Sequence, residues 1–109
     1  MAYDEALAER IRAVLADRDD VTERKMFGGP AFMVGDRMAV GVIQRDLMLR
    51  LGTDATAEAL SRPHVRPMDF TGRPAKGMVY VAPAGVADDA DLARWVATSV
   101  AHVETLPPR

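Results

Sequence analysis

An amphipathic helix is the first element that the pattern of apolar and polar positions predicts. Between residues 4 and 18, Leu7, Ile11 and Val14 recur at the spacing of a single helix face. Asp4 stands directly before this stripe, where its carboxylate can accept hydrogen bonds from the free amides of the first turn. We therefore expect a helix over residues 4–18 that buries one apolar side.

Residues 24–52 change from the helical period to the short apolar runs of β-strands. Gly28-Gly29-Pro30 predicts a break that no regular element tolerates. In the run 47–51 the leucines alternate with Met48 and Arg50, so the leucines share one face of a strand and the other two residues share the opposite face. The strand candidates are residues 31–34, 38–43, 47–51, 65–70 and 76–82, with 24–27 left open as a short addition.

Two more helices follow from local signals. Thr53 is placed to cap a short helix over residues 54–61, which Pro63 ends and in which Leu60 is the one large apolar anchor. Asp88 is placed to cap a final helix, with further acids in its first turn. The apolar stripe of this final helix consists of Leu92, Trp95, Val96, Val100 and Val103.

The elements follow the order α-β-β-β-α-β-β-α. Strands joined by short turns pair antiparallel, so this order predicts an α+β fold in which an antiparallel sheet of about five strands is covered by helices. With 109 residues the chain is near the commonest domain size, and we expect residues 1–109 to form a single domain. Pro67 lacks an amide hydrogen, which places its strand at a sheet edge or at a bulge.

The net charge is only −2, but it is unevenly distributed. Residues 24–52 and 65–82 carry +3 and +2, whereas residues 1–20 and 83–109 carry −3 and −2. Either the solvated helix faces are simply rich in acids, or the basic sheet faces an acidic ligand or partner. The N-terminus lacks a signal-peptide pattern and no apolar run reaches ~20 residues, so we expect a cytoplasmic protein without a membrane span.

The residues that usually carry catalysis do not form a recognisable set. The chain has no cysteine, which excludes a disulfide, a thiolate nucleophile and a cysteine zinc site. His64 and His102 lie far apart without the spacing of metal ligands. Gly28-Gly29-Pro30 does not match a phosphate-binding P-loop, because no Gly-Lys-Ser/Thr follows it. We expect a protein that is not an enzyme, with no catalytic residues, metal or cofactor.

Several different short motifs follow one another along essentially the whole chain. They are Arg24-Lys25-Met26-Phe27-Gly28-Gly29, Met38-Ala39-Val40-Gly41-Val42, Leu49-Arg50-Leu51-Gly52, Val65-Arg66-Pro67-Met68-Asp69-Phe70, Gly72-Arg73-Pro74 with Lys76-Gly77, Asp91-Leu92 with Trp95-Val96, and Leu106-Pro107-Pro108. With these motifs the chain resembles the N-terminal domain family of TfoX/Sxy, bacterial regulators of competence genes. The resemblance implies an α+β fold similar to that of type III secretion chaperones, and it supplies no catalytic residues. Two-domain members append a helical domain, and we expect this chain to be a single-domain member.

Basic residues in and near segment 65–81 form the main candidate interaction or anion site. They are Arg50, Arg66, Arg73 and Lys76, with Asp69 among them. A hairpin would bring Arg66 and Lys76 together, with Arg73 at its tip, and such a cluster binds anions. The alternative is that Asp69 pairs with one of these bases and that each is solvated.

Methionine is abundant for a chain of this length, with seven residues. If Met48, Met68 and Met78 share the face opposite the leucines, the sheet has two apolar faces, and the second one calls for a partner or a second copy. Our leading interpretation is a regulatory or protein-interaction module that forms a homodimer and binds an unknown protein partner. The alternative is nucleic-acid or small-anion binding through residues 65–81, which the acidic net charge and the few aromatic residues disfavour.

Overall fold

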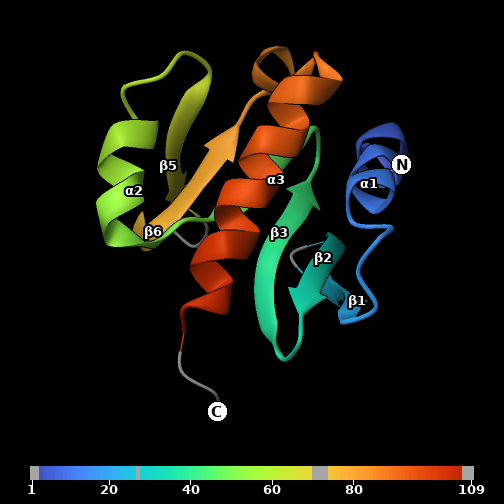
Figure 1. Ribbon diagram of the computed structural model, residues 1–109. Coiled ribbons are helices and arrows are strands. Elements are labelled where there is room, and N and C mark those ends of the chain that lie inside the picture. The colour runs from blue at the N-terminus through green and yellow to red at the C-terminus, as the bar shows by residue number, and fades with distance from the viewer. Residues whose placement is uncertain (1–2, 27, 70–73, 107–109) are drawn as a thin grey trace.

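The computed structural model describes residues 3–26, 28–69 and 74–106 (Figure 1). Three α-helices, six strands and one short 3-10 helix make up this part of the chain. In order they are α1 (Glu5–Val14), β1 (Val21–Met26), β2 (Gly29–Val34), β3 (Arg37–Ile43), β4 (Asp46–Arg50), α2 (Gly52–Ala59), β5 (Val65–Asp69), β6 (Pro74–Val81), η1 (Pro83–Val86) and α3 (Asp89–Glu104).

The strands form one sheet in the order β1-β2-β3-β4-β6-β5, and every neighbouring pair is antiparallel. This confirms the α+β class and corrects the strand number from about five to six. The sixth strand is β1, the short addition left open at residues 24–27, and it begins earlier than that range, at Val21, and pairs with β2 over six residues. Its side chains from Thr22 to Lys25 are exposed, so it lacks the apolar alternation by which the other strands were predicted.

All helices pack on one face of this sheet. In Figure 1, α3 crosses the sheet between α1 and α2, and α2 lies against β6. The main core combines the apolar sides of these helices with the inward residues of β2, β3, β4 and β6. The largest fully buried side chains include Ile11, Phe32, Leu47, Leu49 and Leu92. Burying each of them stabilises the fold by roughly 1.5–3 kcal/mol.

The predicted helix caps are confirmed at both long helices. The Asp4 side chain accepts a hydrogen bond from the Leu7 amide at 3.1 Å, and the Asp88 side chain accepts one from the Ala90 amide at 2.7 Å. The first helix ends at Val14, four residues before the predicted end. Within the described ranges, no helix combines the length and the apolar character needed to cross a membrane.

The predicted break at Gly28-Gly29-Pro30 is wrong for its last two residues, which begin β2. Pro30 lies opposite Lys25 of β1, whereas the pairing of β2 with β3 begins only at Ala31 and Gly41. Pro30, which has no amide hydrogen, therefore lies just before the first residue of β2 that pairs with β3, a position at which a strand tolerates proline.

The start and the anchor of α2 also differ from the prediction. The N-cap position is Leu51, without a side-chain cap, and the helix begins at Gly52 with φ +83° instead of being capped by Thr53. Leu60, the expected anchor, is 37% exposed, and the small Ala59 is buried in its place. A helix with so small a buried side chain depends on its neighbours for stability.

Candidate functional site

The sheet has a second apolar face, opposite the helices, and it is rich in methionine. Met48, Met68 and Tyr80 form a buried cluster there, and three half-buried residues pack against it. We call this surface the methionine face; it consists of Met38, Ile43, Met48, Met68, Met78 and Tyr80. All six come from strands and none from a helix. The prediction that Met48, Met68 and Met78 share the face opposite the leucines is confirmed.

Met48 occupies the centre of the methionine face because its strand neighbours leave room for it. Its Cα partners are Gly41 on β3 and Tyr80 on β6. A Cβ atom at Gly41 would come within 2.6 Å of the Met48 Cε atom. Gly41 therefore lets the thioether lie over its backbone, and a flexible methionine fills the irregular space that remains.

Arg66 lies at the border of the methionine face and is already engaged there. Its Nη2 atom donates to Oδ2 of Asp46 at 2.5 Å, and its guanidinium lies 4.7 Å from the centroid of the Tyr80 ring. The hydrogen bond to Asp46 raises the pKa of Arg66, against a smaller opposing effect of burial. Its ion-pair partner is thus a carboxylate of β4, and most of its charge is compensated within the domain.

Arg50 and Arg24 are two further cations on this side of the sheet. Arg50 is the Cα partner of Met78, and residues directly opposite each other point to the same face. Through β2 and β3, the register connects Arg24 with Met48 in the same way. Lys25 alternates to the helix side, so of these two neighbouring bases only Arg24 lies on the same face as Arg50.

The strand register does not place Arg66 directly opposite Lys76. Arg66 lies opposite Tyr80, which is four residues, or roughly 13 Å of strand, away from Lys76. The register shift between Pro67 and Asp69 confirms the predicted irregularity at the proline and moves the hairpin away from the simple pairing. Arg73 and the side chains of Asp69 and Lys76 lie outside the described residues, so their part of the candidate site stays a prediction.

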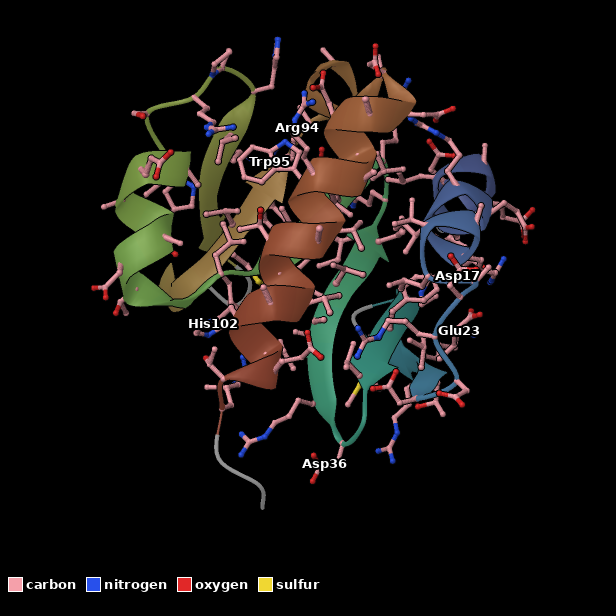
Figure 2. The ribbon with its side chains drawn as sticks, viewed as in Figure 1. Asp17, Glu23, Asp36, Arg94, Trp95 and His102 are labelled. Carbon is pink, nitrogen blue, oxygen red and sulfur yellow. The ribbon has the colours of Figure 1, made fainter. Side chains whose placement is uncertain are left out.

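A groove between α2 and α3 was not anticipated from the sequence. It has a volume of about 430 Å³, and Ala55 and Ala59 of α2 and Trp95 of α3 are among its lining residues. Figure 2 shows Trp95 projecting from α3 on the side of α2, and the Arg62 guanidinium lies 5.3 Å from its ring centroid. The signal in the sequence was the pair of alanines at helical spacing, where larger residues would have filled the space.

Ser99 has a structural environment. It is fully buried, and its hydroxyl lies 2.5 Å from the carbonyl oxygen of Ala39 and 2.8 Å from that of Arg50. One hydroxyl proton thus serves two strand carbonyls and ties α3 to the sheet. Within the part of the chain that the structure describes, no three His, Cys, Asp or Glu residues are grouped so that they could hold a metal ion.

The family model of the TfoX N-terminal domain matches residues 13–103. The chain belongs to the TfoX N-terminal domain family. The match covers every strand and nearly all of α3, which confirms the resemblance seen in the short motifs. No curated protein matches this chain closely enough to count as a relative.

In this TfoX N-terminal domain, the motif that ends β4 shapes the backbone. Gly52 follows Arg50-Leu51 with φ +83°, and the imidazole of His102, labelled in Figure 2, lies directly over it. A Cβ atom at Gly52 would come within 2.4 Å of the ring. Gly77 of β6, with φ +80°, packs closely against the backbone of Gly52. Gly52 and Gly77 together thus allow α2, α3 and β6 to approach each other.

Proposed function

We propose that this TfoX N-terminal domain is a non-catalytic regulatory module that acts in the cytoplasm, forms a homodimer and binds a protein partner through the methionine face. The observation that carries the proposal is the second apolar face itself. Its centre is buried, with Met48 and Met68 only 1% and 3% exposed, so a partner would contact the half-buried margin of Met38, Ile43 and Met78. Every described helix packs on the other side of the sheet, while the methionine face is built from strands alone. Methionine side chains adapt to different partners, which suits a binding surface.

The chemistry at the border of the methionine face supports a partner with an acidic and apolar segment. Asp46 compensates Arg66, but among the described residues neither Arg24 nor Arg50 has an ion pair. A carboxylate of the partner beside apolar side chains would meet both the cations and the half-buried Met78. Such a surface combines apolar anchors with a polar rim, the usual arrangement of a protein interface.

The non-catalytic role is supported by the environments of the reactive groups. The Ser99 hydroxyl is committed to two carbonyls, and the His102 ring packs on Gly52. Membership in a family named for competence regulators agrees with a regulatory role. The alternative, anion or nucleic-acid binding by residues 65–81, has less support, because Arg66 already forms an ion pair with Asp46 and a cation–π contact with Tyr80.

The test is to replace Met78, half-buried on the methionine face, with aspartate. Arg50 lies directly opposite and can pair with the carboxylate, so we expect the fold to be retained while the margin of the methionine face loses an apolar side chain. The matched control is Ala97→Asp, at an exposed position of α3 in the groove. A partner is captured from the native cell with the tagged protein, purified, and titrated against the native chain and both variants by calorimetry.

We expect Met78→Asp to raise the Kd at least tenfold and Ala97→Asp to leave it unchanged. A partner that is lost with Ala97→Asp but still binds Met78→Asp would move the site to the groove and contradict the proposal. Equal binding by all three chains would contradict it as well. Sedimentation equilibrium of the native chain at micromolar concentration tests the dimer separately.

A further inference from the structure

The two edges of the sheet are built differently. The strand order places β1 at one edge and β5 at the other. At β5, Pro67 and the register shift beside it blunt the edge, two devices that keep another strand from pairing there. In contrast, β1 contains no proline and pairs with β2 in one unbroken register over six residues. The edge whose backbone is open to pairing is therefore β1, and its charged side chains Glu23, Arg24 and Lys25 disfavour any added strand that does not match them.

The direction of the peptide groups shows which residues of β1 present this edge. The Gly35 amide donates to the Asp20 carbonyl at 2.8 Å, so residue 20 directs its peptide groups toward β2. In an antiparallel strand the direction of the backbone N–H and C=O groups alternates from one residue to the next. The N–H and C=O groups of Val21, Glu23 and Lys25 therefore point to the outer side, away from β2. The proline opposite Lys25 has no amide hydrogen, in agreement with this assignment. Among the described strands, only β2 pairs with β1.

The charges along β1 fit a second copy of the same strand. When two such edges pair antiparallel about a two-fold axis centred on Arg24, Glu23 of each copy lies opposite Lys25 of the other. Both are outward-pairing residues, so the same two positions exchange backbone hydrogen bonds and place opposite charges across from each other. Each register places one pair of like charges on the axis, Arg24 with Arg24 in this register and Glu23 with Glu23 in a register centred on Glu23. Only the register centred on Arg24 adds two Glu23–Lys25 pairs of opposite charge. The Glu23 side chain is held on the helix side by Arg12, at 2.7 Å (Figure 2).

We propose that the domain dimerises through β1, paired antiparallel with β1 of a second copy in the register that sets Glu23 against Lys25. The two sheets then form one continuous sheet, and both methionine faces lie on the same side of it. This inference rests on the homodimer of the proposed function and adds its interface. A two-fold axis perpendicular to the sheet produces such an isologous contact.

The main test is Lys25→Pro, with Lys25→Ala as its matched control. The Lys25 amide points away from β2, so proline preserves the hydrogen bonds within the domain while removing a donor from the outer edge. Alanine removes the same charge but keeps the donor. Sedimentation equilibrium gives the dimer dissociation constant, and circular dichroism with urea unfolding checks that each variant is folded. We expect at least a tenfold higher dissociation constant for Lys25→Pro and a smaller increase for Lys25→Ala.

A second test does not depend on proline being tolerated. The chain has no cysteine, so Arg24→Cys carries a single thiol placed on the proposed axis. Directly opposite residues of a non-hydrogen-bonded pair have Cα atoms about 4.5 Å apart, within reach of a disulfide. Air oxidation joins the two thiols, with oxygen as the electron acceptor and the loss of both thiol protons. Arg24→Cys is expected to crosslink at low micromolar concentration, whereas Glu5→Cys, exposed on α1, is not.

The outcomes separate the interface from the dimer itself. A native dimer that Lys25→Pro leaves intact, with no faster crosslinking of Arg24→Cys than of Glu5→Cys, overturns the β1 interface but not the homodimer. A native chain that sediments as a monomer at 100 µM overturns both. Binding of the partner to the methionine face is measured independently, so its failure does not bear on the edge.

Discussion

Replacing Gly52 with alanine is expected to destabilise the domain by about 2–4 kcal/mol. An alanine held at the left-handed φ of this position costs roughly 1–2 kcal/mol. Its Cβ would also lie within 2.4 Å of the His102 ring, and such overpacking typically costs about 1–3 kcal/mol. Alanine also lowers the conformational entropy of the unfolded chain, which offsets roughly 0.4–1 kcal/mol of these two costs. This is a large share of the roughly 5–15 kcal/mol by which small domains are stable.

Two variants separate the contributions at Gly52. Gly28 has the same φ of +83° but nothing within 4 Å of its would-be Cβ, so Gly28→Ala measures the backbone cost alone. Adding His102→Ala to Gly52→Ala removes the ring and should recover the overpacking cost, a coupling of at least ~1 kcal/mol. Urea unfolding monitored by circular dichroism gives each value. Equal losses for Gly52→Ala and Gly28→Ala, with no coupling to His102, would refute the reasoning.

Two further predictions concern single interactions. Ser99→Ala should lower the free energy of unfolding in urea by about 1–3 kcal/mol, because it removes the hydroxyl donor from two strand carbonyls. Thr98→Ala, which removes an exposed hydroxyl from the same helix, should lower it by less than ~0.5 kcal/mol. A larger loss for Thr98→Ala than for Ser99→Ala would contradict the role of Ser99. The Arg12 guanidinium lowers the pKa of Glu23 below its ordinary value, chiefly through a hydrogen bond. This pair therefore adds stability above the unfolded pKa and loses it as the pH falls through the folded pKa. Glu23→Gln should therefore lower stability slightly at pH 7, by less than ~1 kcal/mol because both side chains of the pair are more than a third exposed. The loss of stability should shrink on acidification, and a loss that grows toward pH 3 would show that the pair does not act this way.

The parts of the fold that the sequence predicts are those in which one face is buried. The stripe of α1, the alternation of residues 47–51 and the caps Asp4 and Asp88 all follow from local spacing, and all are confirmed. The exposed edge strand β1 has no such signal, because both of its sides carry polar residues. Periodicity reports burial, so a strand that buries little remains invisible to it.

The candidate site was harder to predict because it depends on register. The methionines were assigned to a common face by alternation alone, which is a local property. The partner of Arg66, in contrast, is Asp46 from a strand twenty residues away, and no spacing within residues 65–81 points to it. The shift beside Pro67 then decides which residue of β6 lies opposite Arg66. Only the paired strands determine these contacts.

The position of β6 between β4 and β5 also has a kinetic consequence. Strands β1 to β4 form a meander whose contacts lie close together in sequence. The innermost pair of β4 and β6, however, is Arg50 with Met78, so the chain must close a loop of 27 residues (51–77) before β4 gains its second neighbour. Loop closure costs entropy before its contacts return any stabilisation, and long-range strand pairing slows folding for that reason. The meander can therefore assemble from neighbours, while insertion of β6 is the step at which the domain becomes a single cooperative unit.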